Sequence, residues 1–179
     1  MANERTLELP GVPTSVEDLL AVRDELAESP YGGAAVYVLA QLAYSQDPEL
    51  GLACLTVALT ADRLVDGDKG YKGKQLSLVE MQAFRDRIGR KPYIARSYIQ
   101  GTSPEGAYAL PEGPLRVRIK EQTGDVTAER AKLFVYSTGA DSPRPLTLLP
   151  NNRGLWKVRE WSSLQVGVRP PVEVVDDDI

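Results

Sequence analysis

The spacing of hydrophobic positions changes near residue 92 and divides the chain into two parts. Before that point, apolar residues recur every three or four positions, which is the spacing of helices with one buried face. After it, apolar and polar residues alternate, as in Leu115-Arg-Val-Arg-Ile-Lys120, which is the pattern of half-exposed strands. The sequence therefore predicts an α+β fold, with a helical part at 14–91 and a β part at 92–170.

A bundle of about four helices is predicted in the first part. Thr14 and Glu17 form a capping box, in which each side chain can satisfy the other residue's backbone N–H, and this helix should run to about Glu28. The segment Ser29-Pro30-Tyr31-Gly32-Gly33 should break the helical pattern, because proline stops a helix and glycine opens turn conformations. A second helix should then continue to about Ser45.

Two further helices are predicted, with a loop between them. Asp47-Pro48 is a helix-start signal, because Asp caps free N–H groups and Pro is tolerated in the first turn, and this third helix should run to about Val65. The glycine-rich segment 66–73 is predicted as a loop. Ser77 and Glu80 form a second capping box, which should begin the fourth helix.

Similar alternating stretches in the β part predict six strands, separated by turns rich in Gly, Pro, Asp and Asn. They lie at 93–99, 115–120, 131–137, 145–149, 155–161 and 164–168. We expect an antiparallel sheet, strongly curved or closed like a barrel, with the helices packed on it. Residues 1–179 should form a single domain, because halves of ~90 residues would each have a marginal core. Residues 171–179 should form a flexible tail.

The inventory of reactive side chains narrows the possible chemistry. The chain has no histidine and a single cysteine, Cys54. Histidine is the commonest general base in enzymes, so catalytic sites of the Ser-His-Asp and Cys-His types are excluded. Nearly all zinc sites are excluded for the same reason. Cys54 lies within an apolar helix, where it should be an inert buried thiol. We predict no cofactor, and the inventory favours a protein without catalytic activity.

The sequence also bears on where the protein is found. Residues 1–10 have neither the basic start nor the continuous apolar run of a secretory signal. The longest apolar stretch, at 50–61, is shorter than the ~20 residues that a membrane-spanning helix requires. A lone cysteine fits a reducing compartment. The sequence therefore predicts a cytoplasmic protein with no membrane partner.

Charge is unevenly distributed along the chain, although the net charge is only −4. Residues 1–66 carry three Lys/Arg and eleven Asp/Glu, a net charge of −8, whereas residues 67–170 carry eighteen and ten, a net charge of +8. The opposite charges of the two parts could compensate each other within one fold. Alternatively, the acidic helices of one copy could contact the basic sheet of another. The low pI of about 5.0 argues against a nucleic-acid partner.

Three acidic residues form a candidate metal site. Asp62, Asp66 and Asp68 lie at the predicted end of the third helix and in the loop after it, and the first two would be one helical turn apart. Carboxylates are ligands of magnesium and calcium, and Lys69 or Lys72 would then contact a phosphate. The competing interpretation is a solvated helix end and turn.

Aromatic and polar segments of the β part form a candidate binding surface. Tyr93-Ile-Ala-Arg-Ser-Tyr98 places an arginine between tyrosines, and Ala140-Asp-Ser-Pro-Arg-Pro145 places an acid and an arginine among prolines, close enough to form a pair. The competing interpretation is structural, because a polar network that fixes the order of the strands would use the same residues. The candidate binding residues are Arg96, Tyr98, Asp141, Arg144, Trp156 and Trp161.

These two segments, together with Pro104-Glu-Gly-Ala-Tyr108 and Gly154-Leu-Trp-Lys-Val-Arg-Glu-Trp-Ser-Ser163, resemble the recurring motifs of an uncharacterised bacterial protein family, classed as a domain of unknown function. The resemblance covers roughly residues 62–170. It implies a bacterial origin and a self-contained fold, and it carries no activity over to this chain.

Taken together, the sequence favours a non-catalytic interaction or scaffolding protein, which would bind another protein or a second copy of itself through its sheet face or exposed aromatic residues. The main alternative is a divalent-metal-dependent enzyme or a binder of phosphate or nucleotide ligands. A third possibility is a nucleic-acid-binding regulator.

Overall fold

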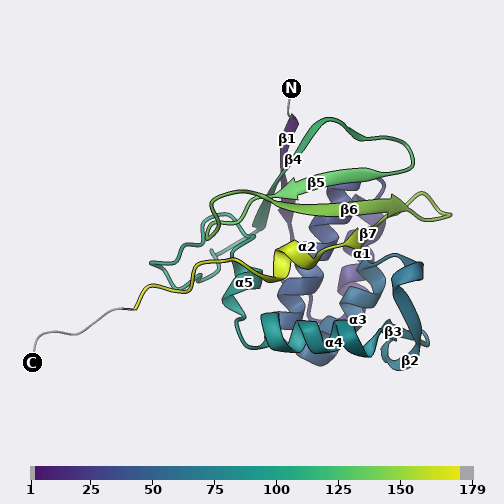
Figure 1. The fold of residues 1–179 in the computed structure, drawn as a ribbon, viewed down its shortest axis with the longest axis horizontal. Coiled ribbons are helices and arrows are strands. Elements are labelled where there is room, and N and C mark those ends of the chain that lie inside the picture. The colour runs from purple at the N-terminus through teal and green to yellow at the C-terminus, as the bar shows by residue number, and fades with distance from the viewer. Residues whose placement is uncertain (1–2, 174–179) are drawn as a thin grey trace, which may run out of the picture.

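A long buried helix packs against one face of an open, five-stranded antiparallel sheet, as the computed structural model of residues 3–173 shows (Figure 1). The strands lie in the order β1-β4-β5-β6-β7, so the first strand of the chain pairs with a strand more than a hundred residues later. Their bounds are Asn3–Leu9 (β1), Leu115–Val126 (β4), Ala131–Val135 (β5), Arg144–Pro150 (β6) and Trp156–Glu160 (β7). Within the described residues β1 and β7 do not pair with each other, so the prediction of a barrel-like closure is wrong.

The buried helix, α2 (Pro30–Gln46), is surrounded by other elements on all sides. Its sequence is apolar on every face, and almost all of its residues from Tyr31 to Tyr44 are buried. Ser29 caps the helix by accepting a hydrogen bond from the Gly32 N–H. A break separates α1 from α2, as predicted, but it ends at Ser29 and does not reach Gly33, because Pro30 occupies the first helical position, where its missing N–H leaves no hydrogen bond unmade.

Five α-helices are described in place of the predicted bundle of about four. The first, α1 (Val16–Leu26), begins one residue later than the capping box predicted: Ser15 accepts from the Asp18 N–H, and the Asp18 carboxylate accepts from Thr14. The other bounds are Pro48–Ala58 (α3), Leu78–Phe84 (α4) and Tyr93–Arg96 (α5). A π-helical turn, η2 (Arg85–Gly89), continues directly from α4.

A β-hairpin replaces the predicted end of the third helix and the loop after it. Helix α3 ends at Ala58, because the next residues are extended along the edge of the sheet, where the Thr60 N–H donates to the Val158 carbonyl. The chain then forms β2 (Leu64–Tyr71) and β3 (Lys74–Leu76). The turn between them has positive φ angles at Lys72 and Gly73, as tight hairpin turns require.

Three further elements differ from the prediction. Strand β1 lies where no element was predicted, and it forms because β4 supplies its hydrogen-bond partners. The segment 93–99 contains helix α5 and not a strand, since the Ser97 N–H bonds locally to the Tyr93 carbonyl. The segment 164–168 begins within a 3-10 helix, η3 (Ser162–Gln165). Most of the predicted flexible tail, at 174–179, lies outside the described residues.

The core lies between the inner face of the sheet and the helices. Alternate residues of the strands point inward, among them Val117 and Ile119 of β4, and they meet the apolar residues of α2. Cys54 is buried in α3, and burial raises the pKa of its thiol to about 12, which agrees with the predicted inert thiol. Within residues 3–173, the helices are all too short or too polar to span a membrane.

Candidate functional site

The six predicted binding residues do not gather on one exposed surface. Tyr98, Trp156 and Trp161 are buried in the core, so the tryptophans are not the exposed aromatic residues that the sequence suggested. In β7, Trp156 and Val158 alternate with basic residues because one face of the strand is buried, and this alternation does not mark a binding surface.

The three charged residues of that predicted set also lie apart. Asp141 forms an ion pair with Arg169, with 2.7 Å between Oδ1 and Nη1, and it does not pair with Arg144 as the sequence suggested. Arg144 donates from Nη2 to the Gly167 carbonyl at 2.7 Å and so holds the segment after η3 against β6. Arg96 has no hydrogen-bond or ion-pair partner for its side chain within residues 3–173.

The predicted acidic metal ligands are separated in the same way. Asp66 lies on β2 and not on a helix, and it pairs with Lys74 at 2.5 Å, which lowers the pKa of its carboxyl group. Asp62 pairs with Arg159 at 2.9 Å, whereas Asp68 faces a different part of the surface. Among the residues that the structure describes, no three acidic or thiol side chains lie together as a metal site would need.

A large cleft lies between helix α3, the β2–β3 hairpin and helix α4 with its π-helical turn. Its volume is about 1140 Å³. Hydrophobic side chains from the four helices α1 to α4 provide much of its wall. The lining residues are Val16, Tyr44, Asp47, Pro48, Glu49, Leu50, Leu52, Ala53, Asp68, Lys69, Gly70, Leu78, Met81, Gln82, Arg85, Gly89 and Arg90.

The apolar wall of the cleft is set by the close packing of α2 and α3. Gly51 of α3 lies against the backbone of Tyr44, the residue of α2 that also packs its ring on Phe84 at a centroid distance of 5.4 Å. This approach leaves Leu50 and Leu52 on either side of Gly51, half-buried and facing the cleft. The wall is therefore an extension of the hydrophobic core.

Charged side chains of both signs line the cleft. Arg85 and Lys69 have no side-chain partner within the described residues, and neither have Glu49 and Asp68. Arg90 forms only a loose ion pair with Asp86, at 3.6 Å, in an exposed position. Unpaired charges around an apolar wall are available to a ligand without the cost of breaking an ion pair inside the protein.

The π-helical turn places Arg85 and Gly89 on the cleft. Such turns widen a helix by one residue and are found frequently at functional sites. Here the turn follows α4 without interruption, and its residues Arg85 and Gly89 line the cleft together with Met81 and Gln82 of the helix.

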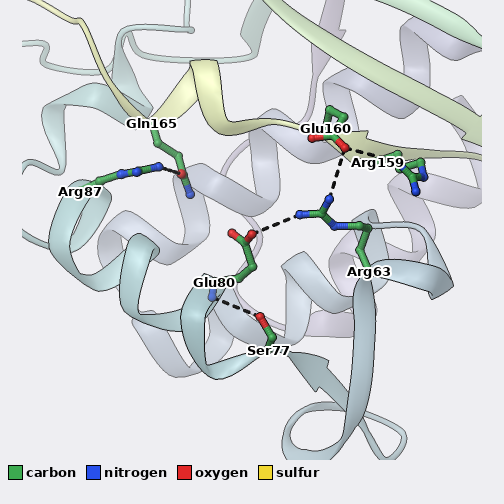
Figure 2. A network of polar contacts seen from close by, with 7 residues as sticks. All are labelled: Arg63, Ser77, Glu80, Arg87, Arg159, Glu160 and Gln165. Atoms are coloured by element: carbon green, nitrogen blue, oxygen red, sulfur yellow. Dashed lines mark hydrogen bonds and ion pairs between the residues drawn. The ribbon is translucent and has the colours of Figure 1, made fainter.

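A polar network holds the opposite side of α4 to the sheet (Figure 2). Arg63 binds Glu80 of α4 at 3.1 Å and Glu160 of β7 at 3.2 Å, and its guanidinium lies 4.7 Å from the ring centroid of Trp161. One helical turn beyond Phe84, Arg87 donates to the Gln165 side chain at 2.8 Å. The network joins the hairpin base, α4 and the end of β7.

The two faces of α4 therefore have different roles. Glu80, Phe84 and Arg87 follow the i, i+4, i+7 spacing of one helix face, and they attach the helix to the rest of the protein. Met81 and Arg85 lie on another face and line the cleft. Ser77 begins the helix by accepting from the Glu80 N–H at 3.3 Å, which confirms half of the predicted capping box, while the Glu80 carboxylate binds Arg63.

The cleft was not predicted from the sequence. Leu78, which lines it at the start of α4, is 73% exposed, and the neighbouring Val79 is 78% exposed. Leu78, Met81 and Arg85 share a spacing of three and four residues, so a helix would place them on one face. The other lining residues come from distant parts of the chain.

A second, smaller cleft of about 510 Å³ contains Lys157 of β7. The Lys157 ammonium donates to the Val57 carbonyl in the last turn of α3, which is a favourable position for a positive charge. Burial, and then the nearby Arg23 and Arg153, lowers the pKa of Lys157 from 10.5 to about 8.

This lowered pKa predicts how stability depends on pH. Above pH 8 the unfolded chain keeps the Lys157 proton that the folded protein releases, so the free energy of unfolding of the wild type should rise relative to that of Lys157→Met up to about pH 10.5. Below pH 8 both states are protonated, and the difference between the two proteins should be constant. Urea unfolding of both proteins at several pH values measures this, and a difference that does not change above pH 8 would contradict it.

The fold and cleft together define an α+β domain in which an open antiparallel sheet supports a helical layer with a charged, apolar cleft. A family model described as a domain of unknown function (DUF6935) matches residues 11–172, and the chain belongs to this family. The match includes the helical part as well as the region 62–170 where the resemblance was noted. Neither the curated proteins nor the solved structures contained a match to this chain.

Proposed function

We propose that this chain is a non-catalytic interaction protein of the cytoplasm, and that the cleft beside α4 binds a segment of a protein partner. The observation that carries the proposal is the combination of an extended apolar wall with charged side chains that have no partner within residues 3–173, namely those of Arg85, Lys69, Glu49 and Asp68. Protein segments present apolar side chains and charges of either sign in the same short stretch. Helix-in-groove and extended-peptide recognition both use such surfaces.

The size of the cleft supports a peptide segment over a small molecule. Its volume of about 1140 Å³ exceeds the upper end of the range in which most small-ligand pockets fall, ~300–1,000 Å³. Leu78, part of its wall, is 73% exposed. A peptide that crosses the cleft could cover this side chain, whereas a compact ligand would leave it exposed.

The charge arrangement of the sheet favours a protein partner over a nucleic acid. On its outer face, Arg118 pairs with Glu4 at 2.8 Å and stacks on Tyr136 at 4.0 Å, and Arg116 lies 3.8 Å from Glu8. These arginines, which belong to the basic strand noted in the sequence, are therefore neutralised by β1. A phosphate backbone would have to compete with these acids.

The proposal is tested by selecting peptides from a random library displayed on phage against the full chain. Selected peptides should bind the wild type and should bind Arg85→Glu at least about tenfold more weakly, because the reversed charge faces the bound peptide. Ala53→Phe should weaken binding as well, because the ring would fill the cleft. Fluorescence anisotropy of labelled peptides measures both effects.

Arg130→Glu is the matched control, because Arg130 is exposed at the β4–β5 turn and its side chain has no partner within the described residues. It makes the same change in net charge away from the cleft and should leave peptide affinity unchanged. If no peptide is selected, or if every selected peptide binds Arg85→Glu and Ala53→Phe as well as the wild type, the cleft is not the binding site.

A further inference from the structure

The sequence contains a segment whose chemistry matches the basic side of this cleft. Residues 174–179, Val-Val-Asp-Asp-Asp-Ile, combine three consecutive acids with three aliphatic side chains. We propose that the cleft beside α4 binds segment 174–179 of a second copy of the chain, so that the protein self-associates by exchanging these segments. This inference rests on the proposed function, because it names the partner of the same cleft.

The basic residues of the cleft provide the complement to the three aspartates. Arg85 and Lys69 are free of side-chain partners among the described residues, and Arg90 is held only by the exposed Asp86 at 3.6 Å. Arginine binds carboxylates through two parallel hydrogen bonds, which makes Arg85 the strongest single contact expected for the segment. Asp47, Glu49 and Asp68 also line the cleft, so the aspartates of the segment must lie toward Arg85 and Arg90.

The apolar residues of the segment match the wall of the cleft. An extended or helical segment that places its aspartates at Arg85 would lay its aliphatic side chains on Leu50, Leu52 and Met81. Leu78, which lines the cleft and is 73% exposed in the single chain, would become covered by the segment. No other stretch of this sequence has three acids in succession, so the match is specific within the chain.

The path of the described chain favours exchange between copies over folding back within one copy. Tyr108 donates its hydroxyl hydrogen to the Arg169 carbonyl at 2.6 Å, and the Val172 N–H donates to the Pro104 carbonyl at 2.9 Å. These bonds hold the chain up to Val172 against the segment 104–108. In Figure 1 this yellow stretch leaves the body on the side opposite the β2–β3 hairpin that borders the cleft.

Exchange between two copies gives a closed arrangement. Each protomer provides one segment and one cleft, so two identical contacts form about a twofold axis, and neither partner is left with an open cleft. The second contact forms within the same complex and is therefore favoured over the first by effective concentration. A dimer held partly by ion pairs should weaken as salt is raised.

Sedimentation of charge variants of the full chain tests the inference. The wild type should show a concentration-dependent monomer–dimer equilibrium that weakens at about 0.5 M salt. Two variants should each be at least about tenfold weaker in dimerisation: Arg85→Glu, and the triple substitution Asp176→Ser, Asp177→Ser and Asp178→Ser. Arg130→Glu should dimerise like the wild type.

A mixture of the two defective variants gives the sharper test. Arg85→Glu retains a normal segment and the triple variant retains a normal cleft, so an equimolar mixture should form heterodimers through one intact contact, although each variant alone dimerises at least about tenfold more weakly than the wild type. Misfolding of either variant does not predict this rescue. A blocked peptide of residues 171–179, labelled at one end, should bind the triple variant and should bind Arg85→Glu at least about tenfold more weakly.

The outcomes separate this inference from the proposed function. A wild type that stays monomeric, a dimer that survives Arg85→Glu, or a mixture without rescue would overturn the exchange. If that happens while phage-selected peptides still depend on Arg85, the cleft binds a different protein and only the present inference fails. If the selected peptides also ignore the cleft variants, both proposals fail.

Discussion

Replacing Gly51 with alanine is expected to destabilise the protein by about 3 kcal/mol, although alanine favours helices over glycine. A Cβ atom at position 51 would lie 2.1 Å from the Cα and 2.4 Å from the Cβ of Tyr44. These are distances to the body of α2, which cannot retreat because it is buried on all sides. Helix α3 must shift instead, and the gain of ~1 kcal/mol in helix propensity is too small to offset this.

The matched control is Gly89→Ala, at a helical glycine with room for the added methyl group. The nearest atom to a Cβ at position 89 is the Phe84 carbonyl oxygen at 3.6 Å, an ordinary contact. This variant should be as stable as the wild type or gain up to ~1 kcal/mol, since only propensity acts. Urea or thermal unfolding measures both variants, and a Gly51→Ala protein as stable as the wild type would show that α2 and α3 are packed less closely than described.

Removing the guanidinium of Arg63 is the second change with a large expected effect. Arg63→Met should lower the free energy of unfolding by about 2 kcal/mol, because it leaves the partly buried Glu80 and the more exposed Glu160 without their shared partner and removes the cation over Trp161. The methionine keeps much of the aliphatic packing, so the loss reports mainly on the charge. Chemical unfolding of the variant measures it.

Two comparisons distinguish this network from ordinary surface ion pairs. Arg159→Met removes an arginine that is more exposed than Arg63 and pairs with Asp62 and Glu160, and it should cost less than about 1 kcal/mol. A double-mutant cycle between Arg63→Met and Glu80→Gln should give a coupling energy of at least ~0.5 kcal/mol. If Arg63→Met and Arg159→Met lower the free energy of unfolding equally, the partial burial of Arg63 does not strengthen its ion pairs.

The same network links stability to the proposed binding site. Glu80 and Arg87 attach the face of α4 that points away from the cleft, while Met81 and Arg85 form the wall. Loss of Arg63 should therefore weaken peptide binding as well, although Arg63 does not line the cleft. Such an effect would arise from the position of α4 and not from a contact with the ligand.

Local signals in the sequence predicted several elements at nearly their observed positions. Asp47-Pro48 begins α3 and Ser77 begins α4, because a cap needs only a side chain and N–H groups two or three residues away. The alternation at Leu115–Lys120 predicted β4, since the two faces of a strand differ wherever one of them is buried. The α+β class and the membership in a family of unknown function also followed from the sequence.

Signals that depend on distant partners were misread. The Pro-Tyr-Gly-Gly segment at 30–33 suggests a break, yet it forms the first turn of α2, because a proline can open a helix and the tight packing around Gly32 and Gly33 requires glycine there. Strand β1 pairs with no strand that is close to it in the sequence, because its partner β4 starts at residue 115. Trp161 is a predicted ligand contact, but the side chain of Arg63, nearly a hundred residues earlier, covers its ring.

The amino-acid sequence alone therefore established the class of the fold, most of the helix starts and the absence of histidine chemistry, because each depends on composition or on residues within one or two turns of each other. Packing in three dimensions settled the open sheet, the separation of Asp62, Asp66 and Asp68, and the cleft in which Lys69 and Arg85 face a shared apolar wall. Those features depend on which distant surfaces meet, and contacts of that kind leave no periodic pattern along the chain.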